Sequence, residues 1–172
     1  MNRPAWAETN DVMRQYYDTE WGFPVRDTVG VYERIVLEAF QAGLAWETVL
    51  RKRPAFRTAF VGFDPAAVAG FTAEDVERLM NDAGIIRNRR KIEAAITNAR
   101  ATQRLTEGGQ DLAELVWSFR PDDPAAPATT RPSRSPESLA LSEELKRRGF
   151  AFVGPVTMYA LLEAIGIIEH RL

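Results

Sequence analysis

The stretch EDVERLMNDAGIIRNRRKI (74–92) determines the fold that this sequence predicts. It continues a helical pattern that opens at Thr72, where Thr72 and Asp75 are spaced as in a capping box. Gly84 then interrupts the pattern, and a second helical pattern begins a few residues later. Two helices joined by a short turn are therefore expected over about 73–105.

Helical periodicity extends over most of the remaining chain. Capping Asp residues, glycines and prolines mark the ends of the helical segments. The helices expected from these signals span about 28–41, 45–53, 65–69, 72–81, 89–105, 112–117, 137–148 and 155–165. No segment alternates polar and apolar residues as a strand does. The sequence thus predicts an all-α fold, formed by a single domain over 1–172.

One segment interrupts this helical pattern. Residues 120–137 contain five prolines and no large apolar residue, which is typical of a surface loop. The chain that follows is too short to fold on its own, so we do not interpret the loop as a domain boundary.

The composition excludes several classes of chemistry. Of 172 residues, 45% are hydrophobic and 27% are charged, as in ordinary globular proteins. The absence of cysteine excludes disulfides, cysteine-based zinc sites, iron–sulfur clusters and cysteine nucleophiles. The one histidine, His170, leaves almost no basis for Ser–His–Asp catalysis or a multi-histidine metal site. Carboxylates, lysines, hydroxyls and aromatic rings remain.

Charge and hydropathy bear on location and partners. No apolar run has the length of a membrane helix, and the N-terminus has no apolar signal-peptide core, so a cytoplasmic protein is expected. The net charge of −2 gives no general attraction to nucleic acids, so any nucleic-acid surface must be local. Basic clusters occur at 51–53, 87–91 and 146–148. For the first and third, the simpler explanation is that cations complement helix C-termini.

The cluster at 87–91 directly follows the Gly84 turn. A helix N-terminus after such a turn points backbone N–H groups outward, where they can bind a phosphate, and the basic side chains would add positive charge. The alternative is a plain helix–helix turn in which glycine caps the first helix.

Glu38 lies on a largely apolar helical stretch, close to Trp46. A buried carboxylate is costly unless it meets a cation or hydrogen-bond donors, so this position suggests a site. The alternative is a surface ion pair with Arg34, four residues earlier. Four aromatic residues clustered near the N-terminus form either core packing or, if they lie beside a carboxylate, a cage for a flat cationic ligand. They are Trp6, Tyr16, Tyr17 and Trp21.

Five stretches together point to a known family. They are YDTEWGFPVRD (17–27), LEAFQAGLAWETVL (37–50), EDVERLMNDAGIIRNRRKI (74–92), WSF (117–119) and KRRGFAFVGPVTMYALLEAIG (146–166). They resemble bacterial 3-methyladenine DNA glycosylase I, over nearly the whole chain apart from the proline-rich loop. The resemblance implies a two-lobed all-α fold with a helix-hairpin-helix motif. It also implies an enzyme that flips an alkylated base out of double-stranded DNA and hydrolyses its N-glycosidic bond.

The resemblance also implies roles for particular positions. Glu38 matches the carboxylate of the catalytic site, which hydrogen-bonds the flipped base, and Trp46 matches the aromatic residue that stacks on that base. The other base-binding positions expected are Tyr16, Trp21 and Trp6. The loop that fills the gap in the duplex corresponds to Gln41, Ala42, Gly43 and Leu44. The DNA backbone is expected to contact Gly84, Ile86, Arg87, Arg89 and Lys91.

The sequence departs from the family pattern where many members hold a zinc ion with two Cys and two His. The corresponding positions are Pro4, Tyr17 and His170, and the chain ends before the fourth. One ligand cannot hold a structural zinc, so no zinc or other cofactor is expected, and His170 is expected to be a surface or terminal residue. Tyr17 and Trp6 are expected to replace the clamp by apolar packing. Met13 stands where a pocket tyrosine is expected.

The expected function is therefore excision of 3-methyladenine from alkylated DNA, in base excision repair, by a metal-free monomer without a membrane partner. Three alternatives remain open. The first is a catalytically weak or inactive protein that binds DNA lesions on the same scaffold. The second is a glycosylase for a different modified base. The third is an all-α interaction protein unrelated to DNA, which requires that the resemblance extend to the fold only.

Overall fold

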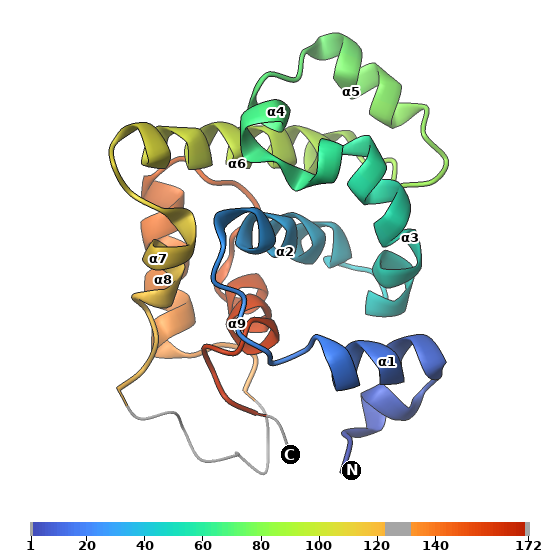
Figure 1. Ribbon diagram of the computed structural model, residues 1–172, viewed down its shortest axis with the longest axis vertical. Helices are drawn as coiled ribbons and strands as arrows, with labels where there is room; N and C mark the ends of the chain where they lie inside the picture. The colour runs from blue at the N-terminus through green and yellow to red at the C-terminus, as the bar shows by residue number, and fades with distance from the viewer. Residues whose placement is uncertain (1, 123–131, 171–172) are drawn as a thin grey trace.

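The structure, a computed structural model, describes residues 2–122 and 132–170, and every regular element in these ranges is a helix (Figure 1). This confirms the predicted all-α class. The elements are η1 (Ala5–Glu8), α1 (Asp11–Thr19), α2 (Thr28–Gln41), α3 (Trp46–Ala59), η2 (Val61–Phe63), α4 (Pro65–Ala69), α5 (Ala73–Met80), α6 (Arg89–Glu107), α7 (Leu112–Trp117), α8 (Pro136–Arg147) and α9 (Pro155–Ala164).

Two differences from the predicted helices have a clear physical reason. Helix α3 does not stop before Pro54 but continues to Ala59. Proline in a helix interior costs about 3 kcal/mol, and the continuation buries Phe56 and Phe60 completely, which offsets that cost. Helix α1 was not predicted; its N-terminus is capped by the Asn10 side chain, which accepts a hydrogen bond from the Met13 backbone N–H at 3.0 Å.

Helix α2 lies at the centre of the molecule, with α6 across one side and α9 across the other (Figure 1). It also contacts α3 and α7, and most of its residues are buried. A large apolar core surrounds it. A smaller cluster forms between η1, α1 and the neighbouring parts of α3 and α9, and includes Tyr16, Tyr17 and Trp21. Trp46 packs against both the large core and the smaller cluster, so these two hydrophobic clusters meet at the start of α3.

Helices α5 and α6 are joined by residues 81–88, here called the α5–α6 turn. The predicted capping box is confirmed, because the Thr72 backbone N–H donates to the Asp75 carboxylate at 2.8 Å. Of the predicted loop over 120–137, residues 123–131 lie outside the described residues, and Pro136 already begins α8. Among the described helices, none combines the length and apolar character needed to cross a membrane.

Candidate active site

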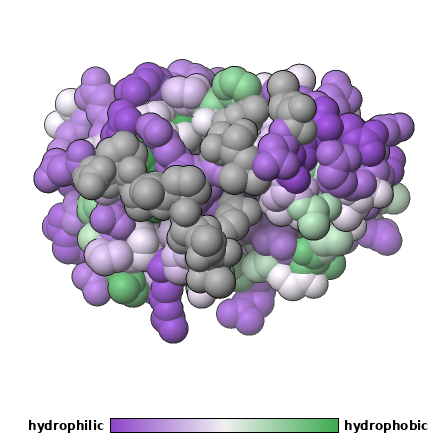
Figure 2. Space-filling model, turned by 90° about the horizontal axis from the view of Figure 1, so that it is seen from below, coloured by the Kyte–Doolittle hydropathy of each residue, from purple (hydrophilic) through white to green (hydrophobic). Residues whose placement is uncertain are grey.

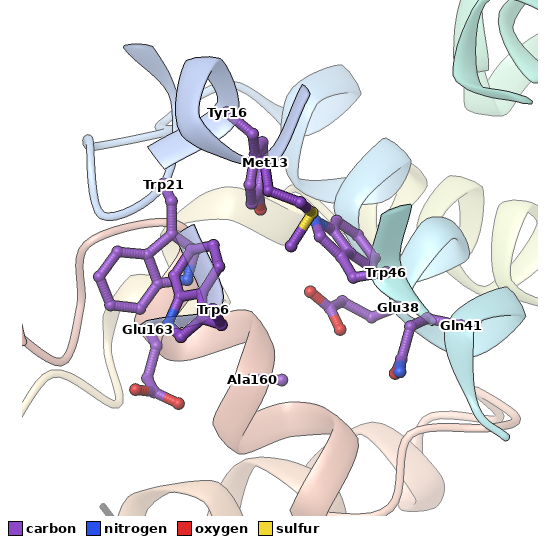
Figure 3. Close-up of a pocket in the computed structure, with 9 residues that line it drawn as sticks. All are labelled: Trp6, Met13, Tyr16, Trp21, Glu38, Gln41, Trp46, Ala160 and Glu163. Atoms are coloured by element: carbon purple, nitrogen blue, oxygen red, sulfur yellow. The ribbon is translucent and has the colours of Figure 1, made fainter. Parts of the chain in front are cut away.

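A pocket of about 390 Å³ opens between the two hydrophobic clusters (Figure 3). Its walls come from η1, α1, the segment after α1, α2, α3 and α9. The lining residues are Trp6, Met13, Tyr16, Trp21, Glu38, Gln41, Trp46, Ala160 and Glu163. All five residues predicted to bind a base line this pocket. Sequence reasoning missed Ala160 and Glu163 on α9, because nothing in the local pattern of that apolar helix indicates which of its faces meets the pocket.

The aromatic side chains form one continuous wall. The rings of Trp6 and Trp21 lie 5.4 Å apart in an edge-on arrangement, and those of Tyr16 and Trp46 lie 5.6 Å apart. Trp46 Nε1 is buried and has no hydrogen-bond partner in the part of the chain that the structure describes. Figure 3 shows this edge of the indole beside Met13. The wall thus offers flat aromatic surface of the kind that attracts a planar cation.

Glu38 projects from the last turns of α2 towards this wall (Figure 3). The residue is 7% exposed, and burial raises the pKa of its carboxyl to about 8. The positive charge of Arg34 lowers this pKa, and the charge of Glu163 raises it. Within the described ranges no hydrogen bond or ion pair engages the Glu38 carboxyl group, so it is available to a ligand in the pocket.

Arg34 does not pair with Glu38, so the alternative of a surface ion pair is wrong. Its guanidinium is buried and donates to Glu20 Oε2 at 2.8 Å and to the Tyr16 hydroxyl at 3.3 Å. Arg53 also donates to Glu20, through two N–H groups at 2.5 and 2.6 Å. This network fixes the Tyr16 ring against the pocket and leaves one buried positive charge near Glu38.

Replacing Arg34 by methionine is expected to raise the pKa of the Glu38 carboxyl further, because the attraction that favours its charged form is lost. The measurement is a pH titration of the Glu38 carboxyl carbon by NMR in glutamate-labelled protein. Arg14→Met, which removes a charge from an exposed pair on α1, serves as the control. An unchanged or lowered pKa in Arg34→Met would contradict this account of the pocket.

The predicted insertion loop directly follows α2. The Gln41 side-chain amide donates to the Leu44 carbonyl at 2.7 Å, and Gly43 has a φ of +82°, which favours glycine. Leu44 is 38% exposed at the surface, whereas Gln41 also lines the pocket. The loop is therefore a closed turn that ends in an exposed apolar residue, and it begins at the pocket edge. Insertion into DNA stays a prediction.

The α5–α6 turn only partly matches its predicted role. The Gly84 N–H donates to Asp82 Oδ1 at 2.8 Å within the turn, so it does not point outward as predicted. Glycine is needed there because a Cβ would lie 2.9 Å from the Ala55 side chain. Arg89 pairs with Glu77 at 2.6 Å. Ile86 and Arg87 follow Gly84, and their N–H groups bond to no described residue.

Lys91 was predicted to contact the DNA backbone, but its side chain is turned into the protein. The residue is 8% exposed, and its Nζ donates to the Phe40 carbonyl at 2.9 Å and to the Ala42 carbonyl at 2.7 Å. Its charge therefore points inward, towards the end of α2. Sequence reasoning could not foresee this, because the carbonyls lie about fifty positions away along the chain.

His170 was predicted to be a surface or terminal residue, but its side chain does not lie at the surface. Its side chain is 6% exposed, and its Nε2 lies 2.8 Å from the Tyr159 hydroxyl and 3.9 Å from Glu163. Tyr17 is completely buried, with its ring 5.5 Å from those of Trp6 and Trp21, as apolar packing of the N-terminal region requires. Residues 2–122 and 132–170 contain no group of three or more His, Cys, Asp or Glu residues that could hold a metal ion.

Comparisons with known proteins agree with the predicted family and with the all-α fold. The methyladenine glycosylase family model matches residues 6–172. DNA-3-methyladenine glycosylase 1 of Escherichia coli is 44% identical over 99% of this chain and 94% of its own. The crystal structure of a 3-methyladenine DNA glycosylase I is 42% identical, with a TM-score of 0.92 over 96% of this chain and 93% of that one. The Staphylococcus aureus enzyme, solved to show how it recognises 3-methyladenine, is 32% identical, with a TM-score of 0.88 over 95% and 92% of the two chains. This chain belongs to the methyladenine glycosylase family.

Proposed function

We propose that this protein is a DNA-3-methyladenine glycosylase of base excision repair, a hydrolase that removes 3-methyladenine from alkylated double-stranded DNA. One observation carries the proposal within this chain. A buried carboxyl group, Glu38, and the indole of Trp46 line the same pocket, of a size that suits a purine.

The chemistry of the lesion fits this pairing. Methylation at N3 makes adenine cationic, which weakens its glycosidic bond and lets the base depart as a neutral molecule. The π-face of an aromatic ring attracts such a cation by about 0.5–2 kcal/mol. A cation beside Glu38 also favours the charged form of its carboxyl, which then accepts hydrogen bonds from the base edge. The pocket thus prefers the methylated base over neutral adenine.

A base reaches this pocket only after leaving the duplex. Flipping costs a few kcal/mol and is easiest for a damaged base. In our proposal the loop of Gln41–Leu44, with the exposed apolar side chain of Leu44, fills the gap that the base leaves. The α5–α6 turn holds the phosphate backbone through the N–H groups of Ile86 and Arg87 and through the exposed Arg87 side chain.

The direct test is to incubate the protein with methylated DNA and to identify the released bases by chromatography. We expect 3-methyladenine among the products. Binding of the duplex without any release would instead support the lesion-binding alternative. Release of a different base alone would support a glycosylase of other specificity, and neither binding nor release would support the interaction protein.

Arg87→Ala is expected to flatten the salt dependence of DNA binding. One phosphate contact contributes about 0.9 to the slope of log affinity against log salt concentration, so the slope should fall by about that amount. Fluorescence anisotropy at several salt concentrations measures it. Arg147→Ala, which removes an exposed charge from α8, is the matched control. Equal slopes for Arg87→Ala and the unsubstituted protein would contradict a phosphate contact at the α5–α6 turn.

We further propose that the protein acts as a monomer in the cytoplasm, without a metal or other cofactor. The large exposed apolar residues are distributed over separate elements, and the face in Figure 2 shows only small separate hydrophobic areas. When the glycosidic bond breaks, its electron pair leaves with the base and water adds to the sugar carbon, so the reaction requires no oxidant, reductant or group-carrying cofactor. A DNA substrate places the activity in the compartment that contains the chromosome.

A further inference from the structure

We propose that Lys91 is a positioning residue that connects the DNA-binding turn to the base pocket and to the 41–44 loop, an inference that rests on the proposed function. Lys91 stands in the first turn of α6, directly after the α5–α6 turn. Its ammonium group reaches across to α2, which carries Glu38 and Gln41 in its last turn. The Lys91 side chain therefore joins the turn proposed to bind the DNA backbone to the end of α2, which forms part of the base pocket.

The end of α2 differs from the ends of the other helices. In each other α-helix of the described ranges, the backbone N–H of the C-cap residue bonds back to a carbonyl of its own last turn. The cap residue of α2, Ala42, makes no such bond, and its ψ of 116° turns the chain away from the helix at once. This abrupt exit is what forms the 41–44 loop at the pocket edge.

Lys91 provides hydrogen-bond donors for backbone carbonyls at the end of α2. Helix C-termini carry carbonyls without intrahelical partners and a partial negative charge. The Lys91 ammonium donates to the Phe40 carbonyl inside the helix and to the Ala42 carbonyl outside it, so it fixes the angle at which the loop leaves α2. Burial lowers the pKa of Lys91, and the two carbonyls provide hydrogen-bond acceptors for the buried group.

The arrangement gives Lys91 a role in catalysis without contact to the base. The turn and the 41–44 loop lie on the same side of the molecule (Figure 1). When phosphates bind to the α5–α6 turn, the link through Lys91 holds the 41–44 loop in a fixed position relative to the DNA. In that position the loop can fill the gap that the flipped base leaves in the duplex. The link matters most where a paired base must be displaced, and least where the lesion is already unpaired.

The test compares excision from two duplexes, with the lesion opposite thymine or opposite an abasic site. Lys91→Met is expected to lower excision from the paired substrate about 10- to 100-fold, since small errors in position carry costs of this size. Excision from the unpaired substrate and binding of free 3-methyladenine should stay within about twofold. Lys146→Met, an exposed lysine on α8, should leave both rates unchanged. If Lys91→Met does not fold, Lys91→Gln, which can donate to one carbonyl, is measured in the same way.

A second comparison uses the loop itself. In a Leu44→Gly background, where the exposed apolar side chain of the loop is absent, Lys91→Met should add little further loss on the paired substrate. Equal losses on both duplexes, or independent effects of the two substitutions, would overturn the inference and make Lys91 a purely structural residue. If the unsubstituted protein released no base from either duplex, the proposed function itself would fail.

Discussion

Glu38→Gln is expected to lower the rate of 3-methyladenine release about 100-fold, while affinity for undamaged DNA stays within about twofold. The amide keeps the size of the side chain but cannot become the anion that accepts a charge-assisted hydrogen bond from the base. Such bonds contribute about 1.5–3 kcal/mol, and each 1.36 kcal/mol lost from the transition state is tenfold in rate. Backbone affinity is unaffected because Glu38 is buried in the pocket, away from the α5–α6 turn.

The measurement is single-turnover release of the base, with DNA affinity determined in parallel. Glu33→Gln is the matched control, because Glu33 lies on the same helix but pairs with Arg57 instead of facing the pocket. It should retain release within about twofold. Parallel loss of release and DNA affinity in Glu38→Gln would indicate that the carboxyl group only supports the fold.

The same substitution is expected to stabilise the protein at alkaline pH. The pKa of Glu38 is about 8 in the folded state, against 4.5 without the protein environment. Below pH 4.5 the carboxyl is neutral in both the folded and the unfolded chain, so its burial does not lower the free energy of unfolding. As pH rises from about 4.5 to 8, the unfolded chain releases this proton and the folded chain retains it, so stability falls across this window. Above pH 8 the full cost of a buried charge remains.

Glutamine carries no such charge, so the stability advantage of Glu38→Gln should grow between pH 5 and pH 9. Its upper limit is about 5 kcal/mol, and water that enters the open pocket reduces it, so we expect about 2–3 kcal/mol at pH 9. In a protein of this size that corresponds to roughly 5–10 °C in the melting temperature. Thermal unfolding at the two pH values measures the difference. An advantage that stays constant between them would mean that the carboxyl is not desolvated.

Local sequence signals predicted the helices well where a cap or a periodic apolar face was present. The Thr72–Asp75 capping box and the stripe of α6 are examples. They failed where tertiary burial outweighed local preference. Pro54 ends a helix by propensity, yet Phe56 and Phe60 carry α3 past it.

The pocket was predictable for a different reason. Glu38 and Trp46 are recognisable because their motifs resemble those of a family whose pocket uses these positions. The electrostatics around them were not predictable, because they depend on partners that are distant in sequence. Arg34 turns away from Glu38 to meet Glu20, and Lys91 turns inward to the end of α2. In both cases a basic side chain that the sequence predicts to be exposed is buried by a contact with residues distant in sequence.

The central claim is that a purine with a methyl group at N3 lies between the aromatic wall and Glu38. A crystal structure of the protein with free 3-methyladenine tests it most directly. The account predicts the base stacked on Trp46, with a Glu38 carboxyl oxygen within hydrogen-bond distance of its edge. A base bound elsewhere on the protein, or one in the pocket that makes no contact with Glu38, would contradict it.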